Sequence, residues 1–471
     1  MMPELCRLSA EEAVRRLKAR EVSPVEMVDA AIARIEAVDG VLNAIPTRCF
    51  ERAHEHAKHL MAQERHIERP PAWLGGLPIA VKDLTPVGGV RTTYGSRLFA
   101  EHVPQRSDLL VDLLEANGAI VIGKSNTPEF GAGASTFNDV FGITRNPWNP
   151  AKSAAGSSGG SAAALASGEV WLATGSDLGG SLRTPASFNG IVGLRPSPGR
   201  VPRGPVQQPF ETLSVGGPMA RTATDAALLL DAMLAQHPED PLSLEAPAVP
   251  FAQAVGRMEA PRRVAFSPDL GLTPVHATVR AVCESAAAGL AHTGIDVEEA
   301  CPDFTDAQRC FQVLRAMSFV TALGPYLDEH RELLKPEIVW NIEQGLALGP
   351  ADLAWAQRAR TRLYYHVVEF FRRYDLLLCP AAIVPPFDAE VRYVEEVEGR
   401  RFDNYVDWIA ITYAITLTSC PAVSVPVGLT ADGLPVGLQI VGPPRGEAQA
   451  LGAARLLEEL AGLSARLPVD P

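Results

Sequence analysis

Three stretches place a polar, reactive side chain among glycine or apolar residues. Lys82 closes the apolar run "LPIAVK", Ser157 lies in "AGSSGGS", and Ser181 follows "SDLGG". Burial lowers the pKa of a lysine, and the neutral amine that results is a base. Lys82 can equally pair with neighbouring Asp83 or reach water with its head group, and Ser157 can simply cap a helix. Taken singly, each of these residues can therefore have either a catalytic or a purely structural role.

Ser181 is the candidate nucleophile of this set. The pattern "TGSDLGGSL" predicts that a strand ends at Asp177, two glycines turn the chain, and a short helix opens at Ser181. The backbone amides of that turn can converge on one oxygen, where a helix N-terminus also favours negative charge; they belong to Leu178, Gly179, Gly180 and Ser181. No histidine lies in these motifs, and the run "GGSLR" around Ser181 lacks the Gly-x-Ser-x-Gly pattern, so a Ser-His-Asp triad is poorly supported.

The joined motifs resemble the amidase signature family. "AGSSGGSAAALASG" and "GSDLGGSLRTPASFNGIVGLRPSPGRVP" look like its signature, and Ser157 and Ser181 have the family's spacing of its two serines. "LPIAVKDLTPVGGVRTTYGS" is similar to the segment with the family's lysine, and "IGKSNTPEFGAG", "TRNPWNP" and "GLPVGLQIVGPP" are similar to later segments. The resemblance spans most of the chain to about residue 450 and is weakest at about 235–370.

The resemblance implies a serine amidase with a Ser-Ser-Lys triad. Ser181 would attack the carbonyl, Ser157 would relay its proton and carry a cis peptide bond, and Lys82 would be the final base. Small carboxylic amides would be the substrates, with ester or carbamate hydrolysis as a side activity. The resemblance also implies supporting residues Ser158, Asp177 and Arg183, and a substrate-binding loop at Gly131, Ala132 and Gly133.

Some positions depart from the family pattern. Ala155 replaces a usual glycine, Leu178 a frequent threonine and Arg195 a common lysine. Thr416 and Cys379 stand where asparagine and threonine are frequent, and we expect these two changes to touch the substrate pocket. Further pocket walls are expected from about 131–135, 205–215 and 310–345, and from the loop after Cys379. The apolar stretch within 310–345 is also typical of core.

Alternation of apolar runs with helical patterns predicts an α/β fold. Strands are expected at 77–83, 119–125, 170–177, 191–197, 374–382, 422–428 and 434–442, and a helix at 108–118. The expected architecture is one large domain, 1–471, with a mixed, mostly parallel central sheet flanked by helices on both sides. Its parts are N-terminal helices (1–70), a signature core (71–225), a variable helical region (226–370) and C-terminal strands with a helix that rejoin the core (371–471).

Bulk properties narrow the partners. The 471 residues carry a formal net charge of −13, which argues against a nucleic-acid or anionic membrane partner. The chain shows neither a signal-peptide pattern nor a run of about 18 apolar residues, and its seven scattered cysteines lack a CxxC pair. We therefore expect a cytoplasmic enzyme with reduced thiols, a small-molecule amide substrate, no cofactor and no metal. A homodimer is a possible assembly.

Other functions fit parts of the sequence. The glutaminase subunit of a tRNA-dependent amidotransferase would share the fold and triad, although 211–233 look more like free-standing amidases. The run from Gly118 to Ser125 has the spacing of a nucleotide-binding P-loop, but its Ala, Ile, Val and Ile favour a strand. His56 and His59 can meet on one helix face as metal ligands, but their charged surroundings favour a solvated surface.

Overall fold

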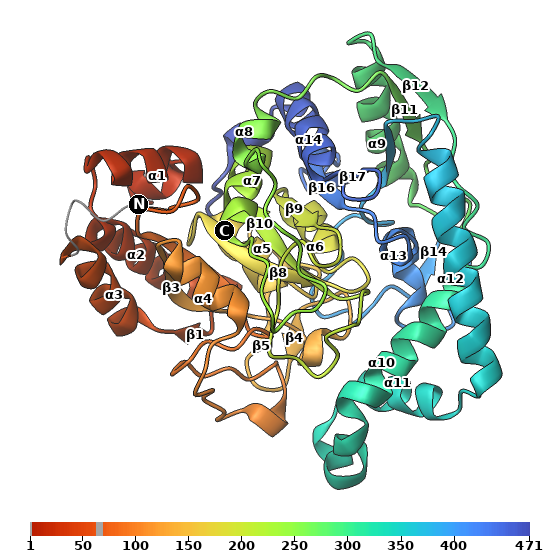
Figure 1. The fold of residues 1–471 in the computed structure, drawn as a ribbon, viewed down its shortest axis with the longest axis horizontal. Helices are drawn as coiled ribbons and strands as arrows, with labels where there is room; N and C mark the ends of the chain where they lie inside the picture. Colours follow the sequence, from red (N-terminus) through yellow and green to blue (C-terminus); the bar gives the residue numbers. More distant parts are fainter. Residues whose placement is uncertain (1, 63–68) are drawn as a thin grey trace.

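The computed structural model describes residues 2–62 and 69–471. Within these residues the chain builds a central sheet of eleven strands (Figure 1). In spatial order they are β1 (Thr47–Arg48), β3 (Ala119–Ser125), β2 (Leu77–Lys82), β8 (Leu172–Asp177), β10 (Val215–Ala220), β9 (Val192–Arg195), β16 (Ala422–Leu429), β17 (Pro435–Val441), β13 (Leu376–Pro380), β11 (Arg263–Phe266) and β12 (Asp296–Glu299). All seven expected strands are confirmed, and the late strands do rejoin the sheet begun by β2.

The sheet is mixed, as predicted, but the expectation that it is mostly parallel was wrong. Only β3–β2–β8 and β13–β11–β12 pair in parallel, whereas the other neighbours are antiparallel. Strand β10, which the sequence analysis did not predict, inserts between β8 and β9 and runs antiparallel to both. The hairpin of β16 and β17 adds another antiparallel pair. An apolar run indicates that a strand is buried on both faces, but it does not indicate whether the strand runs parallel or antiparallel to its neighbours.

Helices cover both faces of the sheet. Helices α5 (Gly159–Ser167) and α6 (Arg183–Asn189) contact each other and pack on one face. The other face carries α7 (Ala223–Ala232), α9 (Ala277–Ala291) and α14 (Glu447–Ala461), with the short α8 (Phe251–Val255) against α7 and α14. The expected helix near 108–118 is α4 (Leu109–Ala116), which packs on β3.

Two further helical groups lie at opposite sides of the molecule (Figure 1). The N-terminal group comprises α1 (Ala10–Ala19), α2 (Pro24–Leu42) and α3 (Phe50–Ala62). A reciprocal capping box between Ser23 and Glu26 starts α2. The other group comprises α10 (Ala307–His330), α11 (Pro336–Leu346) and α12 (Pro350–Phe370), with α13 (Ala410–Leu417) beside it.

Region 226–370 is mainly helical, as expected, but it also contributes β11 and β12 to the edge of the sheet. The edge strand β12 reads "DVEE" and is partly exposed, so it carries no apolar signal. Short strand pairs lie outside the central sheet: β4 (Phe137–Asn138) with β5 (Gly142–Ile143), β6 (Arg145–Asn146) with β7 (Asn149–Ser153), and β14 (Glu396–Val397) with β15 (Arg400–Arg401). In the described part of the chain, no helix is long and apolar enough to cross a membrane.

Candidate active site

Lys82 ends strand β2 and is completely buried. Its Nζ donates to Ser157 Oγ at 2.7 Å, Ser158 Oγ at 2.8 Å and Ser176 Oγ at 3.0 Å. Burial lowers the pKa of Lys82 to about 7, and the carboxylate of Asp177 opposes this shift. Among the described residues Lys82 forms no ion pair with Asp83, which contacts Lys124 instead, and its head group does not reach water. The structure therefore supports a buried amine over both structural alternatives.

The glycine-serine stretch brings both hydroxyls to Lys82. Ser157 and Ser158 precede the first turn of α5, and the Gly156–Ser157 peptide is cis. Gly160 lets this turn pack closely against the chain at Asn126, because a Cβ there would lie 2.3 Å from the Asn126 backbone nitrogen. Ala155, the departure from the usual glycine, has a φ of 55°, a left-handed conformation that glycine adopts more readily than alanine.

Asp177 holds the turn that presents Ser181. Its buried carboxylate accepts hydrogen bonds from the amides of Gly180 (2.9 Å) and Leu182 (3.2 Å). The guanidinium of Arg183 donates to the same carboxylate with Nε and Nη2, both at 3.0 Å. Strand β8, which ends at Asp177, is thus tied to the start of α6, and Ser181 lies between them.

The charge of Asp177 depends on two arginines. Burial opposes ionisation, but Arg183 and Arg195 together hold the pKa of Asp177 well below its usual range. Arg195 Nη1 donates to the backbone oxygen of Asp177 and lies 3.2 Å from its Oδ1. Arg195 therefore supports the same turn as Arg183, because both side chains donate to Asp177 and a donor cation binds an ionised carboxylate strongly.

The predicted oxyanion-binding amides need one correction. Gly180 donates its amide to Asp177, so it is already engaged in the structure. Within the described part of the chain, the amides of Leu178, Gly179 and Ser181 have no protein acceptor, and all three residues line one cavity. The turn thus offers three amides, instead of four, to an incoming oxygen.

Two departures from the family pattern belong to the support of this turn and not to the pocket. Arg183 Nη1 donates to Gln439 Oε1 at 2.7 Å, and Nη2 donates to Thr416 Oγ1 at 3.0 Å. Gln439 in turn donates to Cys379 Sγ at 3.0 Å. Neither Thr416 nor Cys379 lines the cavity, so the expectation that they touch the pocket was wrong.

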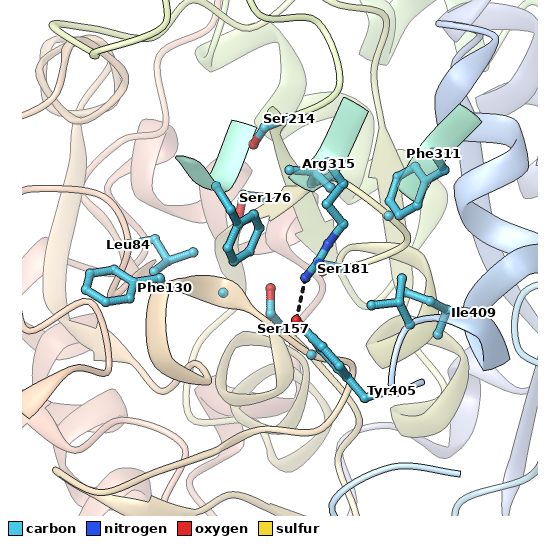
Figure 2. Close-up of a pocket in the computed structure, with 16 residues that line it drawn as sticks. Leu84, Phe130, Ser157, Ser176, Ser181, Ser214, Phe311, Arg315, Tyr405 and Ile409 are labelled. Atoms are coloured by element: carbon cyan, nitrogen blue, oxygen red, sulfur yellow. Dashed lines mark hydrogen bonds between the residues drawn. The ribbon is translucent and has the colours of Figure 1, made fainter. Parts of the chain in front are cut away.

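A cavity of about 90 Å³ opens above Ser157 and Ser181 (Figure 2). Gly131 and Gly133 line it as predicted, but Ala132 does not. Ala132 is 1% exposed and packs among apolar side chains of α10 and α11. The full lining consists of Leu84, Phe130, Gly131, Gly133, Ser157, Ser176, Leu178, Gly179, Ser181, Ser214, Phe311, Arg315, Phe319, Tyr405, Val406 and Ile409.

Sequence reasoning anticipated part of this lining. The expected walls near 131–135, 205–215 and 310–345 all contribute residues, whereas the loop after Cys379 contributes none. Tyr405, Val406 and Ile409 were missed. Ser176 was also missed, although alternation along β8 places it on the same face as Thr174, whose Oγ1 accepts the backbone amide of Lys82.

The P-loop alternative is not supported by the structure. Residues 119–125 form the buried strand β3, which pairs with β2. Lys124 is fully buried and its Nζ contacts Asp83 Oδ1 at 3.2 Å and Thr92 Oγ1 at 2.8 Å, so it is held within the fold. His56 lies on α3 with Nδ1 3.7 Å from Glu115, and no group of three potential ligands in the described residues is arranged to hold a metal ion.

The mixed sheet, the glycine-serine turn and the buried lysine together define an α/β hydrolytic enzyme of the amidase signature class. The sequence model of the family described as Amidase matches residues 26–451, and the chain belongs to this family. It is an enzyme that hydrolyses carbon–nitrogen amide bonds.

Known proteins similar to this chain include acylamidases and tRNA-dependent amidotransferase subunits. An acylamidase of Rhodococcus erythropolis is 33% identical, with 98% of this chain and 97% of that protein covered. A glutamyl-tRNA(Gln) amidotransferase subunit of Geobacter sp. (strain M21) is also 33% identical, with 97% of each covered. Among solved structures, a bacterial aryl acylamidase of the amidase signature family superimposes with a TM-score of 0.89 at 27% identity, covering 98% of this chain and 99% of that one.

Proposed function

We propose that this chain hydrolyses small carboxylic amides through an acyl-enzyme on Ser181, with Ser157 as proton relay and Lys82 as base. The observation that carries the proposal is the 2.7 Å hydrogen bond between Ser157 Oγ and a fully buried Lys82. A pKa of about 7 for Lys82 supports this role, since a base works best when its pKa lies near the working pH.

The proposed reaction proceeds in two balanced halves. Neutral Lys82 takes the proton of Ser157, which takes the proton of Ser181 as its Oγ bonds to the amide carbon. The amides of Leu178, Gly179 and Ser181 stabilise the oxyanion. When the C–N bond breaks, the proton returns from Lys82 through Ser157 to the leaving nitrogen. Water then attacks the ester on Ser181, and its proton passes through Ser157 to Lys82. When the ester bond breaks, the proton returns through Ser157 to Ser181 Oγ, and the carboxylic acid is released.

The same acyl-enzyme also predicts side reactions. Esters and carbamates place a comparable carbonyl before Ser181 and differ mainly in the leaving group. The similarity to an acylamidase and to an aryl acylamidase favours amides as the main substrates. A panel of aryl, aliphatic and carbamate substrates will rank these classes by kcat/KM.

The glutaminase subunit of a tRNA-dependent amidotransferase is the second candidate, because the Geobacter amidotransferase protein is as similar in sequence as the acylamidase. Shape favours the free-standing enzyme: the glutamyl-tRNA(Gln) amidotransferase structure from Thermotoga maritima superimposes with a TM-score of 0.76, against 0.89 for the aryl acylamidase. Glutamine hydrolysis that appears only when partner proteins are added would support the second candidate. Amide hydrolysis by the chain alone supports the first.

The test of the proposed function is labelling of the nucleophile. A fluorophosphonate or sulfonyl fluoride is expected to modify Ser181 and to abolish amide hydrolysis in proportion. Ser181→Ala should lose both the label and the activity, while Ser214→Ala should keep the label, since Ser214 lines the cavity without bonding to Lys82. Full activity in Ser181→Ala would contradict the proposal.

A further inference from the structure

Arg315 brings a positive charge into the cavity above the two serines. It lies on α10, is only 5% exposed, and lines the same cavity as Ser157 and Ser181. Figure 2 shows its side chain extending from the helix toward Tyr405, across the space next to Ser181. The side chain ends in a guanidinium, a planar cation with five N–H donors, so this wall of the cavity carries a positive charge.

The partners of Arg315 are all neutral. Nη1 donates to Asn341 Oδ1, and Nη2 donates to the Tyr405 hydroxyl at 2.8 Å. The guanidinium also lies over the ring of Phe319, 4.4 Å from its centroid. Within residues 2–62 and 69–471, no carboxylate lies within 4.0 Å of Arg315.

This differs from the other buried arginines near the site. Arg183 and Arg195 are completely buried, and both contact the carboxylate of Asp177. Burying an unpaired charge is costly, and buried charges in proteins are normally paired. Within its described part, the fold therefore provides an anion for the two arginines that support the Ser181 turn, but none for the arginine that lines the cavity.

The donors around Arg315 are only partly used. A guanidinium has five N–H groups, and the two hydrogen bonds to Asn341 and Tyr405 leave three without an acceptor among the residues that the structure describes. The Tyr405 hydroxyl accepts from both Arg315 and Asn341, so its own proton remains available to donate. Tyr405 also lines the cavity. Several donors thus converge where the part of a substrate remote from its amide bond would lie.

We propose that Arg315 selects amides that carry a carboxylate, which it binds by paired N–H···O hydrogen bonds with the Tyr405 hydroxyl as a further donor. The proposal rests on the proposed function, because the carboxylated amide must present its carbonyl to Ser181 in the same cavity. Arginine is suited to this task because its planar fork matches both oxygens of a carboxylate. Arg315 and Ser181 line the same cavity, so a substrate that reaches both must carry its carboxylate and its amide within the span of that cavity.

Two kinds of substrate present this chemistry, and matched pairs separate them. A monoamide of a dicarboxylic acid, such as succinamate, carries the carboxylate on the acyl side, and butyramide is its neutral counterpart. An N-acetyl amino acid carries it on the amine side, and the corresponding N-alkylacetamide is neutral. We expect wild-type kcat/KM to be roughly 10- to 100-fold higher for the carboxylated member of at least one pair, as expected for a charge-assisted hydrogen bond.

Variants assign the preference to Arg315. Arg315→Met should remove the preference by lowering kcat/KM for the carboxylated amide, and should leave the neutral amide within about threefold. Arg315→Lys, which keeps the charge without the paired geometry, should retain part of the preference. Arg309→Met is the matched control on the same helix, since Arg309 is exposed and pairs with Asp352 away from the cavity. It should behave as wild type.

Binding separates failure of this inference from failure of the proposed function. Calorimetry with Ser181→Ala should detect binding of the carboxylated amide, and the double variant Ser181→Ala/Arg315→Met should bind at least 10-fold more weakly. Hydrolysis without preference for a carboxylate in wild type would overturn the role of Arg315 and leave the amidase intact. Binding that depends on Arg315, with no hydrolysis of any amide, would overturn the proposed amide hydrolysis at Ser181. It would leave the proposed binding of a carboxylate by Arg315 in place. Equal loss on both members of a pair in folded Arg315→Met would show a structural role only, and the wild-type comparison stands even if that variant fails to fold.

Discussion

Two fully buried lysines on neighbouring strands should respond in opposite ways to the same substitution. Lys82 ends β2 and Lys124 lies on β3, and the strand register places their side chains on opposite faces of the sheet. Lys124 has a carboxylate partner, Asp83, at 3.2 Å, whereas Lys82 bonds only to hydroxyls. We therefore predict that Lys82→Met stabilises the fold and Lys124→Met destabilises it.

The magnitude follows from the pKa of Lys82. Burial lowers it from 10.5 to about 7, and the difference corresponds to about 5 kcal/mol of unfolding free energy. Between these values the unfolded chain binds a proton that the folded chain does not, so stability rises with pH across this window and the full cost applies below it. Lys82→Met also loses the hydrogen bonds to the serines, which offsets about 2–4 kcal/mol of the stability gained by removing the buried amine. Lys82→Met should thus gain roughly 1–3 kcal/mol at pH 7, whereas Lys124→Met should lose roughly 3–5 kcal/mol because Asp83 is left buried and unpaired.

Urea unfolding at pH 7 and pH 9.5, together with amide hydrolysis, checks this reasoning. The gain from Lys82→Met should shrink at pH 9.5, because wild type then bears less of the cost. Its kcat should fall about 10²- to 10⁴-fold, the usual contribution of a general base. In wild type, kcat/KM should rise about tenfold per pH unit below 7 and level off above it. If Lys82→Met is destabilised as much as Lys124→Met and wild-type activity lacks this acid limb, Lys82 is not a buried base.

Two smaller changes test the surroundings of Lys82 and Ser181. Ser176→Ala removes a 3.0 Å hydrogen bond from Lys82, so we expect kcat/KM to fall about 2- to 10-fold and the acid limb to move to lower pH, because an acceptor of the ammonium is lost. An unshifted limb would mean that Ser176 does not interact with the base. Gly180→Ala places a Cβ 2.3 Å from Thr412 Oγ1 at a φ of 129°, and should cost roughly 2–5 kcal/mol in urea unfolding. Gly433→Ala, also at positive φ but with nothing within 4 Å, should cost only about 1–2 kcal/mol, and equal losses would exclude the close contact as the cause.

The catalytic candidates were predictable because their signals are local. Lys82, Ser157 and Ser181 each lie at a strand end or a helix start that glycine and apolar residues mark in the sequence, and the structure places these three at one cavity or in direct contact with it. The same holds for the supporting pair Asp177 and Arg183, which are six residues apart and meet across one turn.

Features that depend on long-range pairing were missed. Strand β10 reads "VGGPMA" and contains two glycines and a proline, so its place between β8 and β9 comes from its partners and not from its own propensity. The hydrogen bond from the Gly180 amide to Asp177 could not be predicted from the sequence either. The geometry of the folded turn decides which of four neighbouring N–H groups faces the carboxylate. Ala132 illustrates the same limit, since a loop pattern does not say which of three consecutive residues lines the cavity.

The cavity is lined by residues from distant parts of the sequence, and this explains why the sequence indicates the reaction more readily than the substrate. The proposed base, relay and nucleophile come from residues 82–181, where each motif lies next to the element that positions it. The groups that would meet the remainder of a substrate, Arg315 and Tyr405, come from α10 and from a loop 90 residues later, and their side chains meet only in the folded chain, through a hydrogen bond. An arginine inside an apolar helical stretch is typical of core as well as of a pocket. The lack of a carboxylate within 4.0 Å among the described residues, which is a property of the folded chain, distinguishes Arg315 from Arg183 and Arg195, the two arginines that hold the Ser181 turn.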